Sequence, residues 1–258
     1  MRVAILAYHS ILATGESRVP EQWSREHTVT EESLCAHMEC LNRGGWHAIL
    51  PDDLDSQERK PGKYVLITLD DGLCSDRIAA QVLKTRGLRA IFYVTWSNIG
   101  RPGYLNKNDI ITLASDGFRI GSHGFTHTPL VGRTDDELHR ELVLSRQLLS
   151  ELLGDPVVDI ALPFGRYDQR VLDAASQAGY TRIMTSDFAP AYTRRKVYPR
   201  LGITCRTSVA DLKILLTGSR ARISWRRALT GLRRRGKALV GSIAAGHPRF
   251  DDSGTAGS

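Results

Sequence analysis

Thr68-Leu69-Asp70-Asp71-Gly72 is the stretch that decides the fold and the chemistry of this chain. It ends an apolar run, residues 64–69, that is preceded by Pro61-Gly62 and broken by two adjacent carboxylates and a glycine. A short, β-branched run between turn residues is typical of a buried strand. The two acids therefore lie where a strand opens into a loop, which is where α/β folds place their ligand chemistry.

Two adjacent carboxylates at the end of a core strand need a positive partner, because burying an unpaired charge is costly. A metal ion would serve. The alternative is that Asp70 or Asp71 caps the helix expected to begin near Ser75. The dipeptide alone does not choose between these interpretations.

The rest of the chain predicts an α/β barrel. Apolar runs that indicate strands alternate with helical patterns, and this alternation favours a mostly parallel sheet. Seven or eight strands in one domain favour a barrel over an open sheet. The strands are predicted at 2–8, 46–50, 64–69, 89–95, 118–123, 157–162, 180–185 and 197–204, and the helices at 30–43, 75–86, 106–116, 134–153, 167–178 and 208–216. Residues 10–29 are predicted to form a long loop, and loops of that length are usually functional.

Composition excludes several classes of protein. The 258 residues are 41% hydrophobic and 24% charged, as in ordinary globular proteins. No apolar run reaches the ~20 residues of a membrane span.

The positive charge is concentrated near the end of the sequence. Nine of the 35 Lys and Arg residues lie within 219–249, where there is no Asp or Glu, and the net charge of the other residues is close to zero. We therefore expect no nucleic-acid-binding face on the barrel. The four cysteines have no metal-finger or redox spacing, which favours free thiols.

A second motif, His123-Gly124-Phe125-Thr126-His127, follows another predicted strand. Residues four apart in a helical turn share a face, so both imidazoles can reach one ion. Two histidines and one aspartate make a three-ligand set that leaves room for water and substrate, as a catalytic metal site requires. The remaining carboxylate, Asp70, would then be free to accept a proton from the attacking water.

A third motif, Leu162-Pro163-Phe164-Gly165-Arg166-Tyr167, also follows a strand. Pro163 and Gly165 predict a tight turn whose backbone N–H groups could stabilise an oxyanion. The alternative is a plain strand-to-helix turn. Trp96 follows the strand at 89–95 and, like Tyr167, Trp23 and Tyr104, could stack on a sugar face; ordinary packing is the alternative for each.

In this order and spacing, the three motifs resemble the polysaccharide deacetylase family, which has the NodB-homology domain and belongs to the carbohydrate esterases. The resemblance covers roughly residues 1–217. It implies a single-domain, NodB-like barrel of distorted (β/α)7 type. It also implies metal-dependent removal of acyl groups from sugars, with one divalent ion, Zn²⁺ first and Co²⁺, Ni²⁺ or Mn²⁺ as alternatives. The roles it implies are catalytic base for Asp70, metal ligand for Asp71, His123 and His127, and oxyanion donor for the backbone N–H of Phe164.

The chain departs from the family pattern at two places. The family arginine that precedes the third motif is replaced by Ala161, for which Arg200 or Arg166 could substitute. The late catalytic histidine is missing, but Tyr8-His9 closes the first strand, similar to the branch that includes poly-N-acetylglucosamine deacetylases. That similarity implies His9 as the catalytic acid. The alternative is a hydrogen-bonded core histidine.

The segment 218–258 is predicted to be a basic tail with a disordered end. Apolar residues recur every three or four positions from Arg222 to Ile243, with arginines between them. This pattern is typical of a helix lying on an anionic membrane, or of a helix packed on the barrel with a solvated basic face. Because the first 13 residues make too short a signal peptide, we expect a cytoplasmic enzyme at the inner face of the membrane.

The leading hypothesis is a deacetylase of an N-acetylated sugar in a glycan or lipid-linked saccharide, within cell-envelope or exopolysaccharide assembly. An esterase for O-acetylated polysaccharide would share the site. A non-catalytic barrel that binds glycans or acts as a scaffold is the third hypothesis, prompted by the two departures.

Overall fold

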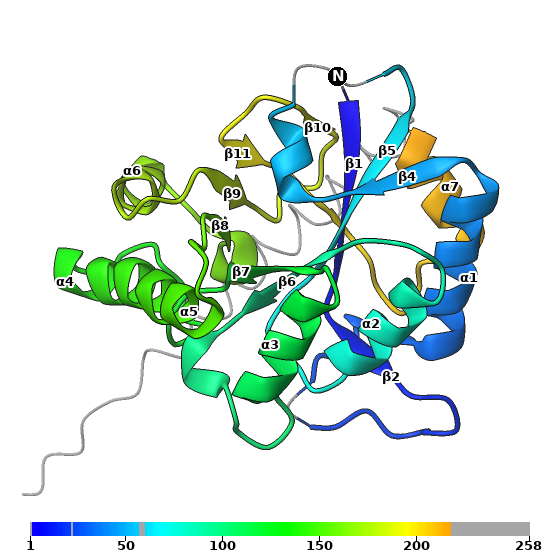
Figure 1. Ribbon diagram of the computed structural model, residues 1–258, viewed down its shortest axis with the longest axis horizontal. Coiled ribbons are helices and arrows are strands. Elements are labelled where there is room, and N and C mark those ends of the chain that lie inside the picture. Colours follow the sequence, from blue (N-terminus) through cyan, green and yellow to red (C-terminus); the bar gives the residue numbers. More distant parts are fainter. Residues whose placement is uncertain (1, 22, 57–59, 218–258) are drawn as a thin grey trace, which may run out of the picture. The chain divides into compact units, whose positions relative to one another are not determined.

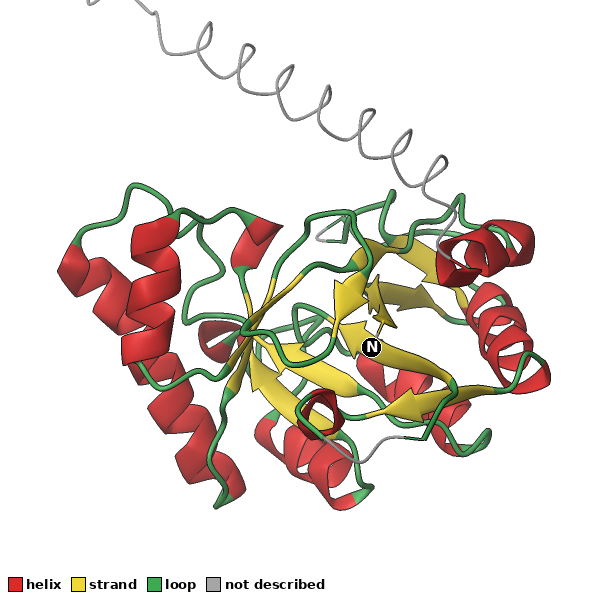
Figure 2. Cartoon of the chain, turned by 90° about the horizontal axis from the view of Figure 1, so that it is seen from above, coloured by secondary structure: helices red, strands yellow, loops and turns green. Residues whose placement is uncertain are grey.

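The computed structural model describes residues 2–21, 23–56 and 60–217. Ten strands form one nearly closed, barrel-like sheet with helices around its outside (Figures 1 and 2). The strands are β1 (Arg2–Tyr8), β4 (Trp46–Ile49), β5 (Lys63–Leu69), β6 (Ile91–Val94), β7 (Arg119–Ser122), β8 (Asp159–Ala161), β9 (Arg182–Met184), β10 (Ala191–Tyr192), β11 (Val197–Tyr198) and β12 (Leu201–Gly202). The helices are α1 (Glu31–Arg43), α2 (Asp76–Lys84), α3 (Lys107–Ser115), α4 (Asp135–His139), α5 (Ser145–Leu153), α6 (Gln169–Gln177) and α7 (Val209–Thr217).

The strand order confirms the predicted α/β barrel. Along the sheet the order is β10-β1-β5-β6-β7-β8-β9-β11, and β12 also pairs with β1, on the edge opposite β5. All of these pairs are parallel except β1 with β10. Because β11 and β12 are consecutive in the chain, the segment that carries them joins the two ends of the sheet.

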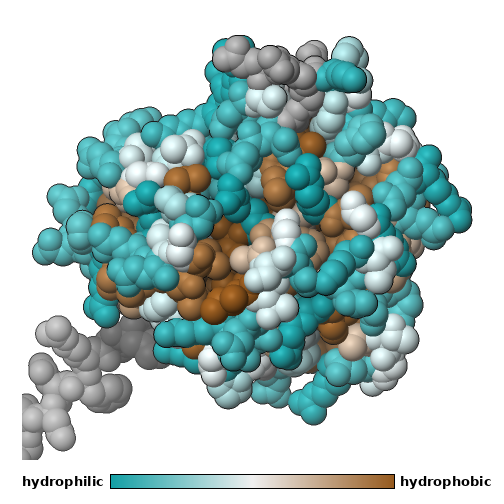
Figure 3. Space-filling model, viewed as in Figure 1, coloured by the Kyte–Doolittle hydropathy of each residue, from teal (hydrophilic) through white to brown (hydrophobic). Residues whose placement is uncertain are grey.

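The helices cover the outside of the sheet with apolar faces. In α1, Thr30 accepts a hydrogen bond from the Ser33 N–H as the N-cap, and the predicted face of Leu34, His37, Met38 and Leu41 is buried. Most of the face in Figure 3 is hydrophilic, and hydrophobic residues show near its centre, where Figure 1 draws β6 and β7 between α3 and α5. Within the described ranges, no helix combines the length and apolar character needed to cross a membrane.

The structure differs from the prediction in several places. The predicted loop 10–29 begins and ends in a short parallel pair, β2 (Ser10–Leu12) with β3 (Thr28–Thr30). The predicted strand 197–204 is two short strands, β11 and β12, separated at Pro199, which has no N–H for a sheet hydrogen bond. The predicted helix 134–153 contains a π-helical turn, Arg140–Leu144, between α4 and α5.

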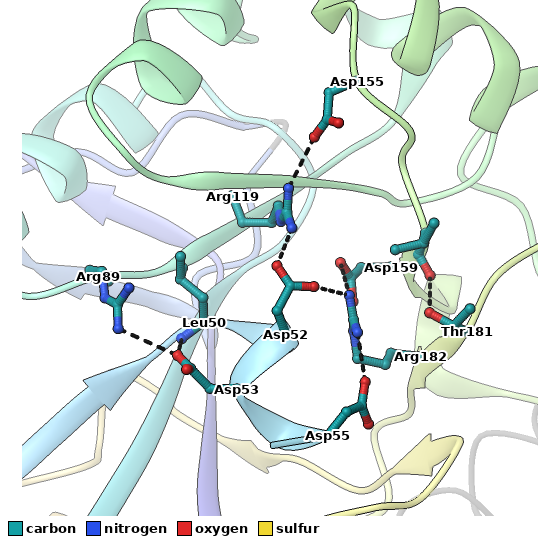
Figure 4. A network of polar contacts seen from close by, with 11 residues as sticks. Leu50, Asp52, Asp53, Asp55, Arg89, Arg119, Asp155, Asp159, Thr181 and Arg182 are labelled. Atoms are coloured by element: carbon teal, nitrogen blue, oxygen red, sulfur yellow. Dashed lines mark hydrogen bonds and ion pairs between the residues drawn. The ribbon is translucent and has the colours of Figure 1, made fainter. Parts of the chain in front are cut away.

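The amino-terminal end of the barrel is closed by packing and by ion pairs. Leu54, in the 3-10 turn Pro51–Leu54, is buried with Leu66 and Tyr198 in the core cluster. Beside it, Arg182 at the start of β9 bonds Asp159 (2.5 Å), Asp55 (2.8 Å) and Asp52 (2.5 Å) (Figure 4). With this end closed by structural contacts, the chemistry is expected at the opposite edge, where the strands end.

The thiols of Cys35, Cys40, Cys74 and Cys205 are all free, as predicted. The predicted tail, residues 218–258 with its pattern from Arg222 to Ile243, lies outside the described residues, and its boundary with the barrel stays a prediction.

Candidate metal and catalytic site

The three predicted metal ligands lie together at the carboxyl edge of the sheet. Asp71 follows β5, and His123 and His127 follow β7, two strands away. The Asp71 Oδ1 atom is 3.3 Å from His123 Nε2 and 3.2 Å from His127 Nε2. Ligand atoms bound tetrahedrally to one Zn²⁺ at its usual distances lie roughly 3.4 Å apart. The donor set and its spacing therefore fit a divalent cation.

A backbone contact orients one of the imidazoles. His123 Nδ1 donates a hydrogen bond to the carbonyl oxygen of Ala161 at 2.8 Å. Because a carbonyl can only accept, Nδ1 carries a proton, and this contact turns Nε2 toward Asp71. Such a partner on the second nitrogen is typical of metal-binding histidines.

Backbone strain is concentrated in the same loops. Among the described residues, Asp71 (φ 79°), His127 (φ 59°), Phe164 (φ 58°) and Arg194 are the non-glycine residues with positive φ. Three of these four belong to the three motifs. Left-handed backbone at such residues costs about 1–3 kcal/mol each and is found preferentially at functional sites.

Asp70 is paired with a buried arginine and not with the three candidate metal ligands. Arg200 Nη1 and Nη2 donate to Asp70 Oδ1 (2.6 Å) and Oδ2 (2.7 Å), and both side chains are almost fully buried. Arg200 is held in turn by Thr68 Oγ1 (3.1 Å) and the Thr185 carbonyl (3.0 Å). Of the two arginines that could replace the family arginine, Arg200 therefore occupies the place beside Asp70, whereas Arg166 is exposed.

The electrostatics keep both carboxylates ionised. Burial raises the pKa of Asp70, but Arg200, His123 and His9 outweigh it, and the net pKa is lowered. Burial likewise raises the pKa of Asp71, and the imidazoles of His123 and His127 bring it well below its usual range. Both groups are thus negative at neutral pH.

His9 lies near Asp70. The β1–β5 register pairs Tyr8 with Leu69, so the residues that follow these strands are neighbours. His9 Nε2 is 4.0 Å from Asp70 Oδ2, and the His9 ring stacks on His27 at 4.7 Å between centroids. Burial lowers the pKa of His9, while Asp71 and Asp70 oppose this shift. The sequence pattern did not indicate the stacking role of His27.

A cavity of about 110 Å³ opens beside these groups. Its lining comes from the β2–β3 connection, the Asp71 loop and the loops after β6 and β7: His9, Ser10, Trp23, Ser24, Asp71, Leu73, Asn98, Tyr104 and His127. Trp96 is not among these residues; it is partly exposed, with Lys107 Nζ 5.8 Å from its ring centroid. A larger cavity of about 490 Å³ at the amino-terminal end is lined by Asp55, Thr181 and Arg194 to Lys196 and contains none of the predicted site residues.

The third motif forms the tight turn that Pro163 and Gly165 predict. Pro163–Gly165 is a 3-10 turn, and a Cβ on Gly165, at φ 60°, would lie 2.2 Å from Ser186. The turn exposes 53% of Phe164, whose ring centroid is 4.8 Å from that of His127. Tyr167, also exposed, donates a hydrogen bond to Asp187 Oδ2 at 2.6 Å. Phe164 thus lies next to the three-ligand cluster, and Tyr167 lies further along the same loop.

Comparisons with known proteins identify the family. Residues 57–183 match the family model described as polysaccharide deacetylase. A relative from Bacillus subtilis (strain 168), YxkH, named provisionally as a polysaccharide deacetylase, is 30% identical over 202 residues, which cover 76% of this chain and 69% of YxkH. The chain belongs to the polysaccharide deacetylase family.

Solved structures share the fold. The Streptococcus pyogenes deacetylase PplD, in complex with acetate, superposes with a TM-score of 0.75 at 21% identity, covering 84% of this chain and 98% of that one. IcaB from Ammonifex degensii gives a TM-score of 0.71 at 21% identity, covering 83% and 97%. At these identities the likeness establishes a NodB-like barrel.

Proposed function

We propose that the protein is a metal-dependent hydrolase that removes an acetyl group from an N-acetylated sugar of a glycan or lipid-linked saccharide. Family membership supports deacetylation of a glycan as the class of activity. The observation that carries the proposal is that two adjacent carboxylates have different neighbours. Asp71 lies 3.2–3.3 Å from two imidazole nitrogens, whereas Asp70 points to Arg200 and His9.

Asp71, His123 and His127 would hold the cation, with Zn²⁺ first and Co²⁺, Ni²⁺ or Mn²⁺ as alternatives, since a mixed nitrogen and oxygen donor set suits all of them. A cation bound there would acidify a water molecule and polarise the acyl carbonyl. The third-motif loop would complete the site, with the Phe164 N–H, held by Pro163 and Gly165, donating to the developing oxyanion.

Asp70 would act as the general base. A carboxylate oxygen has two lone pairs, so the paired contact with Arg200 leaves Asp70 able to accept a further proton. His9, 4.0 Å away, would donate a proton to the departing amine nitrogen. One proton taken from water and one given to the amine nitrogen convert the amide and water into acetic acid and an amine. At neutral pH the acid then loses its proton, and the products leave as acetate and an ammonium group.

The substrate would lie across the mouth of the cavity. Phe164 and Tyr167 present exposed aromatic rings on one loop, as sugar-binding surfaces do. Trp96 does not line the cavity, so as a predicted substrate contact it would bind a part of the sugar chain outside the cavity. Arg200 beside Asp70 and His9 nearby support a catalytic role against the non-catalytic hypothesis, which the two sequence departures had prompted.

The test compares the two adjacent aspartates. Asp70→Asn should retain about one divalent ion per chain and lower turnover of N-acetylglucosamine oligomers by about 10²–10⁴-fold, because only the base is lost. Asp71→Asn should lose both the ion and the activity. Metal content by elemental analysis and released acetate are the measurements.

Normal turnover by Asp70→Asn would exclude it as the base. The same assay on acetylated xylan distinguishes the alternative O-acetyl esterase: release of acetate from xylan but not from chitin oligomers would favour an ester substrate. Metal-replete protein inactive on both would favour the non-catalytic barrel.

We also propose that the basic tail brings the enzyme to an anionic membrane surface on the cytoplasmic side. Six Lys and Arg residues within 226–237 would each contribute about 1 kcal/mol near such a surface. The full chain should sediment with phosphatidylserine vesicles at low salt, and replacing Arg233, Arg234 and Arg235 by Gln should weaken this binding. Equal sedimentation of the two proteins would contradict the proposal.

A further inference from the structure

Glu141 is a buried carboxylate whose partners all belong to the loop between the two histidines. Its side chain is 6% exposed, and no ion pair within the described ranges involves it. Its Oε2 accepts hydrogen bonds from the backbone N–H groups of Phe125 and Thr126, both at 2.9 Å. Its Oε1 accepts a short hydrogen bond from the Thr126 hydroxyl. Since a buried carboxylate is costly unless it is hydrogen-bonded, these contacts strongly constrain the loop.

The loop that Glu141 holds is under conformational strain. His127 has left-handed backbone (φ 59°), which is costly for a residue with a side chain, whereas Gly124 adopts φ 76° without that cost. A Cβ on Gly124 would lie 3.2 Å from Glu141 Oε2, so the carboxylate packs directly against the loop. Without its three acceptor contacts, the segment would be free to relax from the conformation that brings the His127 Nε2 atom within 3.2 Å of Asp71.

The π-helical turn Arg140–Leu144 carries this carboxylate. Ser145, four residues further on, lies on the same helical face, and its Oγ is 3.1 Å from Ser122 Oγ. Ser122 Oγ in turn accepts the Gly124 N–H at 3.2 Å. Two polar side chains from one helical segment therefore contact the start and the middle of the histidine loop. π-helical turns inside α-helices are frequently found at functional sites.

We propose that Glu141 is a positioning residue that sets the metal affinity of the site by holding residues 124–127 in the conformation that aims both imidazoles at one ion. This inference rests on the proposed metal-dependent function. In this role Glu141 contacts neither the metal nor the substrate.

The test measures metal binding rather than activity. Glu141→Gln removes the negative charge and leaves one acceptor oxygen for three donors, because the amide NH₂ cannot accept. The variant should weaken Zn²⁺ binding by about 10–100-fold, as loss of the groups that hold metal ligands in place typically does. The visible spectrum of the Co²⁺-loaded variant should also change. Glu151→Gln, an exposed site on α5, is the matched control and should bind Zn²⁺ like the wild type.

Thr126→Val provides a second variant that removes one of the three contacts. It should weaken Zn²⁺ binding by a smaller factor, and this effect should disappear in the Glu141→Gln background because the two groups act through the same contact. A chelator competition assay gives the affinities, and circular dichroism of the metal-free proteins checks folding.

Unchanged Zn²⁺ affinity and an unchanged Co²⁺ spectrum in folded Glu141→Gln would overturn the inference while leaving the proposed function intact. If that variant does not fold, unchanged affinity in Thr126→Val would overturn it equally. Wild-type protein that binds no divalent ion would instead remove the proposed function, and with it this role of Glu141.

Discussion

At the residue scale, the neighbouring carboxylates Asp70 and Asp71 differ because of what each one faces. Successive side chains at the end of a strand point in different directions, so one reaches the histidines and the other reaches Arg200. Arg200 lies 130 positions later in the chain. Two residues of the same type therefore acquire different chemical properties from their surroundings, as in other pairs of acids at catalytic sites.

Removing Arg200 should be costly because its partner stays buried. Arg200→Met leaves Asp70 without a counterion and should lower the free energy of unfolding by about 3–5 kcal/mol, measured by urea denaturation. Arg166→Met, at an exposed position, should change it by less than about 0.5 kcal/mol. Similar losses in the two variants would mean that the Asp70–Arg200 pair is not important for stability. The double variant Asp70→Asn/Arg200→Met should recover part of the loss.

At the scale of elements, the strands place the site residues because their carboxyl ends share one edge of the sheet. The register aligns Tyr8 with Leu69 and Val94 with Ser122, so His9 meets Asp70, and His123 N–H donates to the Val94 carbonyl at 2.8 Å. A shift of one residue in either pairing would turn these side chains to the other face of the sheet. Close packing between strands is therefore part of how the site is built.

Gly121 in β7 tests this packing. A Cβ at this position would lie 2.5 Å from two ring carbons of Tyr93 on β6, too close for a real contact. Gly121→Ala should lower the free energy of unfolding by about 1–3 kcal/mol through overpacking, measured by denaturant titration. Gly202→Ala in β12 is the control, because no atom lies within 4 Å of its added Cβ. Equal stability of the two variants would show that the β6–β7 contact adjusts freely.

At the scale of the whole molecule, buried polar contacts join segments far apart in the sequence. His37 on α1 contacts the Tyr8 hydroxyl of β1 at 3.2 Å through Nδ1 and the Thr207 carbonyl, just before α7, at 2.9 Å through Nε2. Burial lowers the pKa of His37, and the Thr207 contact only partly opposes this. The folded protein therefore holds His37 neutral where the unfolded chain would protonate it.

This linkage predicts acid sensitivity with a definite sign. The unfolded chain takes up a proton on His37 below pH about 6.5, so its stabilising contribution is complete above that pH and is lost as pH falls toward the lower pKa of the folded state. In this window His37 should add up to about 1.4 kcal/mol per pH unit to the slope of unfolding free energy against pH. His37→Phe should show a shallower slope than the wild type in urea titrations from pH 7 to 5. Parallel curves would contradict the prediction.

The sequence alone determined the fold class and the residues from which a metal site can be built. Alternating apolar runs and helical patterns suffice for a parallel barrel, because periodicity reflects which face of each element is buried. The position of Asp70, Asp71, His123 and His127 directly after strands then predicts one shared edge, and the coordinates place Asp71 and the two histidines together there.

Only the tertiary structure decided which distant groups complete the site. The sequence offered Arg200 and Arg166 as equal candidates to replace the family arginine, and only the fold chose Arg200. His27 and Glu141 lie in segments whose local pattern is that of an ordinary loop and helix, and nothing in their spacing connects them to the motifs. The contacts of all three residues depend on the closure of the sheet through β12, on the fold of the β2–β3 connection and on the π-helical turn. Arg200, for example, contacts a residue 130 positions earlier in the chain. Sequence periodicity reports only which face of each element is buried, so it does not predict contacts between distant elements.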